Sequence, residues 1–83
     1  MEYQVRTKPS VNKDLKKLDK SDYYRILAAF TVLSKDPFVG KKMYGKYKSC
    51  YNYRVWPYRI IYQVYNKALV VLVIRVGHRQ GVY

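Results

Sequence analysis

The sequence predicts an α+β domain with the element order βααβββ, in which a mainly antiparallel sheet of four strands packs on a two-helix hairpin. Two patterns carry this prediction. Apolar and polar side chains alternate through much of the C-terminal half, as they do in strands with one buried face. Apolar residues of the N-terminal half instead recur every three or four positions, as on one side of a helix. A chain of 83 residues is expected to form a single domain, residues 1–83, with a small core.

The first strand and both helices are predicted in the N-terminal half. Residues 2–8 alternate in the manner of a short strand. One helix is predicted from residue 11 to about 19 with Ser10 as its N-cap, and a second from residue 22 to about 35 with Ser21 as its N-cap. The two or three residues left between them favour an antiparallel hairpin, whose apolar side should pack on the sheet.

Three more strands are predicted in the C-terminal half, after a basic connector at residues 40–48. They span residues 50–56, 58–65 and 69–76. Trp56-Pro57 marks the first reversal, because proline is excluded from the middle of a strand, and Asn66-Lys67 marks the second. The third strand is almost wholly apolar, which is typical of a central strand buried on both faces.

Arginines are predicted on the sheet face that the helices leave open. Arg54 shares a strand face with Asn52, and Arg59 lies opposite the apolar face of its own strand. Arg75 interrupts the third apolar run. From residue 37 to 83 the chain has nine Lys and Arg residues and no Asp or Glu. Converging guanidinium groups without a nearby acid are suited to holding phosphates.

The overall charge indicates a polyanionic partner. The formal net charge is +12 and the isoelectric point is about 9.9. Residues 1–36 carry eight cations and five acids, so most of the excess lies in residues 37–83. This lopsided distribution favours nucleic acid or an acidic protein as partner over the alternative that the charge serves only solubility.

Several classes of function are not supported by the composition. One His and one Cys make neither a metal site nor a disulfide, and Gly40 and Gly45 lack the spacing of a phosphate-binding loop. Cys50 is interpreted as a small strand residue rather than a nucleophile. No metal and no cofactor are therefore expected. The sequence has no membrane-spanning apolar run and no signal peptide, so we expect a cytoplasmic protein without a membrane partner.

Three segments in this order resemble the RelE-like toxins of bacterial and archaeal toxin–antitoxin pairs. They are Tyr58-Arg-Ile-Ile-Tyr-Gln-Val64, Val73-Ile-Arg-Val-Gly-His-Arg79 and the terminal Val82-Tyr83, with Cys50-Tyr-Asn-Tyr-Arg-Val55 similar to the preceding strand. The resemblance covers residues 45–83 well and implies the same fold. It also implies the family's activity, which is metal-independent cleavage of messenger RNA in the A site of a translating ribosome.

The resemblance also implies which residues act. Arg59 and Arg79 look like the family's phosphate-binding arginines, and Tyr83 looks like its C-terminal tyrosine, which stacks on a base or moves a proton. Arg54 and Asn52 stand where well-known relatives carry lysines. Arg54 keeps the charge but stays protonated and cannot act as a base. His78 titrates in the right range and is the first candidate for the base, with Tyr83 second.

Other residues are expected to bind RNA without taking part in the reaction. They are Lys41, Lys42, Lys46, Lys48, Asn52, Trp56 and Arg75. Trp56 has two interpretations, because it either stacks on a base or packs on Pro57 and covers the hairpin.

Two other functions stay open at this point. One is a ParE-like toxin that shares the fold and inhibits DNA gyrase without cutting RNA, and the other is a basic RNA-binding module with no enzymatic activity. The expected partners are an acidic, RelB-like cognate antitoxin, the ribosome and messenger RNA.

Overall fold

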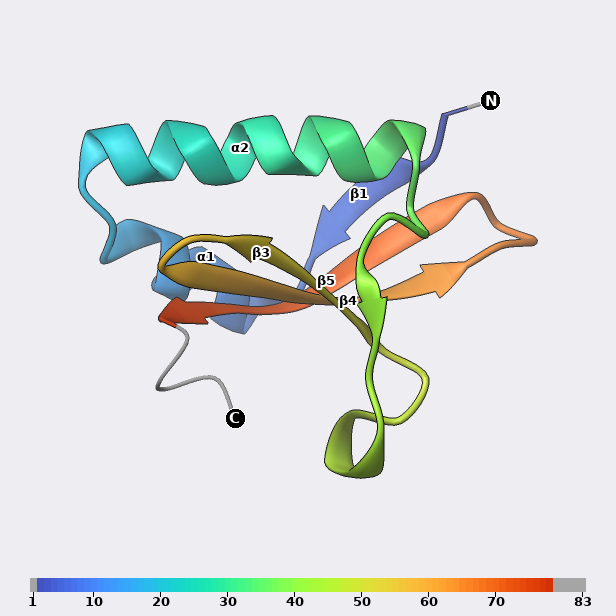
Figure 1. The fold of residues 1–83 in the computed structure, drawn as a ribbon. Helices are drawn as coiled ribbons and strands as arrows, with labels where there is room; N and C mark the ends of the chain where they lie inside the picture. Colours follow the sequence, from blue (N-terminus) through green and yellow to red (C-terminus); the bar gives the residue numbers. More distant parts are fainter. Residues whose placement is uncertain (1, 79–83) are drawn as a thin grey trace.

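The structure contains every helix and strand that the sequence predicts, in the predicted order, and one additional short strand. The computed structural model describes residues 2–78 (Figure 1). Its elements are β1 (Gln4–Thr7), α1 (Pro9–Lys16), α2 (Lys20–Lys35), β2 (Lys41–Lys42), the 3-10 turn η1 (Gly45–Tyr47), β3 (Tyr51–Val55), β4 (Tyr58–Tyr65) and β5 (Val70–His78). The α+β class is confirmed. Within residues 2–78, no helix is long and apolar enough to cross a membrane.

The sheet has five strands instead of the predicted four. Its order is β1-β5-β4-β3-β2, with β1 parallel to β5 and every other pair antiparallel. The additional strand, β2, lies in the segment predicted to be only a connector, where Lys41 pairs with Asn52 and Lys42 with Tyr51. Two residues are too few to show a strand period, so this pairing left no sequence signal.

Both predicted N-caps are wrong by about two residues. Helix α1 begins at Pro9, whose fixed φ and missing N–H suit the first helical position, so Ser10 lies inside the helix. Helix α2 is capped by Asp19, whose carboxylate accepts a hydrogen bond of 2.8 Å from the backbone N–H of Asp22. Ser21 therefore also lies inside its helix.

Both helices cover the same face of the sheet, and the main core lies between the helices and that face (Figure 1). Its fully buried members come from every layer: Val11, Ile26, Leu33, Ile60, Tyr62, Val71 and Val73. Helix α1 also covers the edge of β5 beyond β1, where Asp14 accepts a hydrogen bond of 3.3 Å from the backbone N–H of Val76. The opposite face of the sheet is not covered by a helix.

Tyr62 fastens the segment after α2 to the sheet. Its hydroxyl donates to the carbonyl of Pro37 at 2.8 Å and accepts from the N–H of Gly40 at 3.1 Å. Burial raises the pKa of Tyr62 to about 12. A Cβ on Gly40 would lie 2.5 Å from the Tyr62 hydroxyl and 2.8 Å from the carbonyl oxygen of Asn52, so only glycine fits there. This contact fixes where Lys41 enters the sheet beside Asn52.

A register shift in β5 decides which residues face the helices. Ile61 pairs with Arg75 while Tyr62 pairs with Val73, so Ile74 is an extra residue on β5. Beyond this bulge the alternation of β5 is reversed, because a one-residue slip moves every later side chain to the other face. Arg75 is thereby placed on the open face with Ile61.

Candidate functional site

The open face brings together two of the predicted arginines. Arg54 and Arg59 stand directly opposite each other in the β3–β4 register. The Nη1 of Arg59 donates to the side-chain oxygen of Asn52 at 3.1 Å, which fixes the guanidinium over the sheet. Arg59 is half-buried. Arg54 is exposed, and its side chain has no hydrogen bond or ion pair within residues 2–78. One guanidinium is therefore held in place and the other is free to follow a ligand.

A shallow hollow of about 270 Å³ lies beside these arginines. Its lining is Val39, Gly40, Lys41, Asn52, Tyr53, Arg54 and Arg59. Lys41 belongs to it because β2 pairs Lys41 with Asn52, so a third cation joins the two guanidinium groups. None of the described residues that line the hollow is a histidine or a carboxylate. Such an arrangement can hold a phosphate and stabilise additional negative charge on it.

The open face is less bare than the sequence suggested. A small second core, made of Met43, Cys50 and Ile61 with Tyr47 and Ile74 against it, covers part of this face. Cys50 is buried within it as a free thiol, which agrees with its interpretation as a structural residue. The segment after β2 folds over the sheet to make this cluster, and the arginine hollow lies beside it.

His78 is not brought to the arginine hollow. It pairs with Tyr58, while Arg59 pairs with Gly77. Because neighbouring residues of a strand point to opposite faces, His78 shares the face of Tyr58 and not that of Arg59. The His78 and Tyr58 rings meet edge to face with centroids 6.0 Å apart. Arg79 and Tyr83, the other predicted catalytic residues of this region, lie outside the described residues.

The β3–β4 turn is tied to the start of α2. Tyr58 donates a hydrogen bond of 2.9 Å to Asp22, and this bond raises the pKa of the Tyr58 phenol. Arg25 contacts Asp22 at 3.2 Å and donates to the carbonyl of Trp56 at 2.7 Å. The Trp56–Pro57 peptide bond is cis, and 53% of the Trp56 residue surface is exposed at this turn.

The predicted RNA-binding lysines surround a second hollow, of about 400 Å³. It is lined by Lys41, Lys42, Met43, Tyr44, Lys46, Tyr47 and Asn52. Lys48 is exposed just beyond it. Arg75 is exposed on β5, which the strands β3 and β4 separate from β2. Sequence reasoning missed Tyr44, which is 81% exposed among these lysines. The interleaving of tyrosines with lysines in Lys41-Lys-Met-Tyr-Gly-Lys-Tyr-Lys48 was the available signal.

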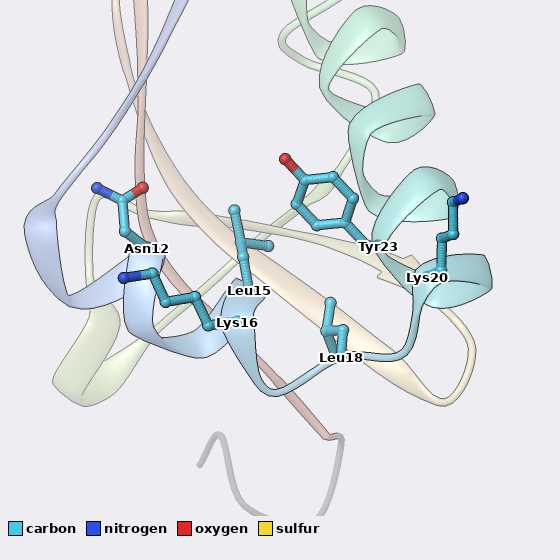
Figure 2. A pocket seen from close by; sticks show the side chains of 6 residues that line it. All are labelled: Asn12, Leu15, Lys16, Leu18, Lys20 and Tyr23. Carbon is cyan, nitrogen blue, oxygen red and sulfur yellow. The ribbon is translucent and has the colours of Figure 1, made fainter.

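A third hollow lies between the helices, away from the arginines. Its volume is about 660 Å³, and its lining residues are Asn12, Leu15, Lys16, Leu18, Lys20 and Tyr23. Figure 2 shows Leu15, Leu18 and Tyr23 directed into the space between α1 and α2, with Lys16 and Lys20 at its rim. An apolar floor with cationic edges is suited to an amphipathic segment that carries acidic side chains.

No group of three or more His, Cys, Asp or Glu side chains capable of holding a metal ion occurs in the part of the chain that the structure describes.

Comparison with known proteins places the chain in a family. The family model described as the ParE toxin of type II toxin–antitoxin systems, parDE, matches residues 5–83. Toxin RelG of Mycobacterium tuberculosis is 34% identical over 89 residues, an alignment that covers 100% of this chain and 98% of RelG.

Solved structures give the same result. The toxin–antitoxin complex RelBE2 from Mycobacterium tuberculosis matches with a TM-score of 0.88 and 30% identity, over 95% of this chain and 100% of the matched chain. The archaeal RelE–RelB complex from Pyrococcus horikoshii matches with a TM-score of 0.79 and 27% identity, over 100% of both chains. With its two helices on an arginine-bearing sheet, the chain belongs to the RelE/ParE family of type II toxin–antitoxin toxins.

Proposed function

We propose that this toxin is a ribosome-dependent endoribonuclease that cleaves messenger RNA without a metal ion. The observation that carries the proposal is the pairing of Arg54 with Arg59 beside Lys41, in a hollow without acidic residues. Three cations around one point are suited to a scissile phosphate, whose charge grows during cleavage. The lack of acidic residues near them keeps their charge available to RNA.

The reaction would use the nucleophile that RNA itself carries. The 2′-OH attacks the adjacent phosphorus in line, the 5′-oxygen leaves, and the products are a 2′,3′-cyclic phosphate and a 5′-OH. Arg59, held by Asn52, would bind the phosphate in the ground state, and Arg54 would move onto the equatorial oxygens as charge develops. Arg79 and Tyr83 keep the phosphate-binding and C-terminal roles that the resemblance implies.

The described part of the hollow lacks a histidine or carboxylate to accept the proton of the 2′-OH, and this is why we propose dependence on the ribosome. Guanidinium groups do not accept protons at physiological pH, and His78 lies on the other face of the sheet from Arg59. The described lining of the hollow therefore offers neither a histidine nor a carboxylate as general base. Precise positioning of the 2′-OH by the ribosome would compensate, since orientation alone can lower a barrier by several kcal/mol, roughly 7–11 at most.

Cleavage of ribosome-bound and free message tests this proposal. Purified toxin should cut message in the A site of translating ribosomes and leave a 2′,3′-cyclic phosphate, with little cutting of the same RNA alone. Equal rates on free and ribosome-bound RNA would exclude the proposed dependence. No cleavage of either substrate would exclude the nuclease.

An acidic, RelB-like antitoxin is the partner we propose for this toxin. The support is that the two similar solved structures are toxin–antitoxin complexes, one of them RelE with RelB. The basic open face would attract an acidic segment that is disordered when free, and the groove between α1 and α2 in Figure 2 would take an amphipathic helix. Activity should vanish at one equivalent of the purified antitoxin. A neighbouring gene product that does not bind would refute this part of the proposal.

The second candidate function is inhibition of DNA gyrase without RNA cleavage. The observation that favours it is the absence of a histidine or carboxylate among the described residues of the arginine hollow, together with the ParE description of the matching family model. DNA damage with intact messenger RNA after induction would select this candidate over the nuclease.

A further inference from the structure

Tyr44 is an aromatic side chain held out into solvent by an ordered segment. It is 81% exposed, the largest exposure among the large hydrophobic residues of 2–78. The neighbouring Met43 is only 9% exposed and packs in the second core. Gly45 follows in the left-handed region at φ +68°, which turns the chain sharply after Tyr44. The ring is therefore presented by a built turn and not by a loose loop.

Backbone hydrogen bonds close this turn on both sides. The N–H of Met43 donates to the carbonyl of Cys50 at 2.9 Å, the N–H of Lys48 to Gly45 at 3.0 Å, and the N–H of Cys50 to Tyr47 at 2.9 Å. Lys46 lies with its Nζ 5.7 Å from the centroid of the Tyr47 ring, so the turn also places a cation beside an aromatic face. A fixed turn of this kind can bind a ligand without first becoming ordered.

The hollow under Tyr44 adjoins the arginine hollow. Lys41 and Asn52 line both of them. A ligand whose phosphate lies on Arg54 and Arg59 therefore extends past Asn52 into a space flanked by Lys42, Lys46 and the ring of Tyr44. Exposed aromatic rings among cations are the usual receptor for single-stranded nucleic acid, since the bases stack and the lysines bind the backbone.

We propose that Tyr44 is a stacking platform for an unpaired base of the RNA strand whose phosphate occupies the Arg54–Arg59 hollow, with Lys42 and Lys46 on the flanking phosphates. The proposal deepens the proposed function and rests on it. Stacking on a tyrosine face is tolerant of sequence, so this subsite adds affinity and fixes the path of the strand without selecting a particular base.

Single-stranded RNA fits this surface better than an acidic protein segment does. Lysines supply point charges suited to phosphates. A peptide helix would need an apolar trough, and the apolar side chain of Met43 is already covered here. Because the two hollows share Lys41 and Asn52, a ligand that fills both carries a phosphate and a planar ring a short distance apart, as one nucleotide does.

A binding measurement with a non-cleavable strand tests the proposal. The probe is a short single-stranded 2′-O-methyl RNA that carries one 2-aminopurine, and the readouts are fluorescence anisotropy and quenching of the aminopurine by stacking. Tyr44→Ala should weaken binding on the order of tenfold, whereas Tyr44→Phe should bind as the wild type does. Tyr24→Ala is the matched control, since Tyr24 is 56% exposed on α2, and it should have no effect.

The salt dependence of RNA binding distinguishes the contribution of stacking from that of phosphate contacts. Tyr44→Ala should leave the slope of log affinity against log salt unchanged, whereas Lys42→Ala should reduce that slope by about one. Circular dichroism should show the same melting temperature for Tyr44→Ala and wild type, so that lost binding is not lost folding.

Tyr44→Ala that binds the probe as tightly as wild type would overturn the subsite. If that variant also binds the antitoxin more weakly, the surface belongs to the protein partner instead. Wild-type toxin that does not bind the probe at all would overturn the subsite too, and cleavage of ribosome-bound message by that same toxin would retain the proposed function. Tyr44-dependent binding by a toxin that cuts no message would retain the subsite and remove only the nuclease.

Discussion

Replacing Arg54 by glutamine should stabilise the fold and weaken the function. Arg54 stands directly opposite Arg59, and no acid occurs between residues 37 and 83 to separate their charges. Like charges directly opposite in a sheet cost on the order of 0.2–1 kcal/mol. The exposed side chain of Arg54 has no hydrogen bond or ion pair within residues 2–78, so Arg54→Gln removes the repulsion without breaking a hydrogen bond or ion pair there.

The size of the effect follows from this repulsion. A gain of about 0.5 kcal/mol in the free energy of unfolding corresponds to about 2–4 °C in melting temperature for a domain of this size. The gain should shrink at about 1 M salt, where the screening length falls to about 3 Å. Cleavage should fall by roughly 10- to 100-fold, since a hydrogen bond to a charged group contributes about 1.5–3 kcal/mol.

Thermal unfolding at low and high salt, together with cleavage of ribosome-bound message, measures both effects. Arg54→Lys keeps the charge and should keep the low-salt melting temperature. Lys67→Gln lowers the net charge equally at the exposed β4–β5 turn, and should raise the melting temperature less than Arg54→Gln does. A lower melting temperature for Arg54→Gln at low salt would refute the repulsion between the two arginines, and unchanged cleavage would refute their role in binding the phosphate.

Three other substitutions test the contacts around the hollow. Asn52→Asp puts a carboxylate where the Asn52 oxygen now accepts from Arg59 at 3.1 Å, so cleavage should fall about 100-fold while the melting temperature is not lowered; undiminished cleavage would contradict the role of Arg59. Gly40→Ala should lower the free energy of unfolding by about 1–3 kcal/mol in urea, because its Cβ meets the Tyr62 hydroxyl at 2.5 Å; a neutral effect would disprove the close contact. Tyr62→Phe should cost about 1 kcal/mol at neutral pH through its lost hydrogen bonds. Because the pKa of Tyr62 is about 12 in the fold and 10.0 ordinarily, the unfolded chain loses this proton first, and wild-type stability should decline between these pH values more than that of Tyr62→Phe. Parallel declines of the two proteins in alkaline urea titrations would argue against that shift.

Strict alternation made the strands predictable. The apolar face assigned to the strand at 58–65 is the one that packs under the helices, with Ile60 and Tyr62 fully buried. Ile26 and Leu33, which recur at helical spacing in the second predicted helix, are likewise fully buried in the core. These positions follow from local periods, which a single sequence displays.

Features that depend on pairing between distant segments were not predictable. The bulge at Ile74 reverses the alternation of β5, and no residue in this strand indicates the bulge from the sequence alone. This reversal is why Arg75 reaches the open face and why His78 lies with Tyr58 instead of Arg59. The two-residue strand β2 also exists only through its partner β3, and with it the place of Lys41.

The candidate site was predicted in its charges and not in its aromatic part. Arg54, Arg59 and Asn52 were assigned to one face by alternation alone, and the structure places them around one hollow. Tyr44 was missed because its exposure depends on the left-handed turn at Gly45 and on the burial of Met43. Tyrosines interleaved with lysines mark this connector in the sequence, but which ring is exposed depends on how the connector folds.

Mapping messenger RNA 5′ ends after induction of the toxin in cells tests the proposed activity most directly. Wild-type toxin should produce new 5′ ends in phase with codons, and Arg59→Ala, at equal protein level and equal melting temperature, should produce about 100-fold fewer. Unchanged growth arrest by Arg59→Ala, or arrest by the wild type with intact messages and damaged DNA, would contradict cleavage of messenger RNA at the arginine hollow.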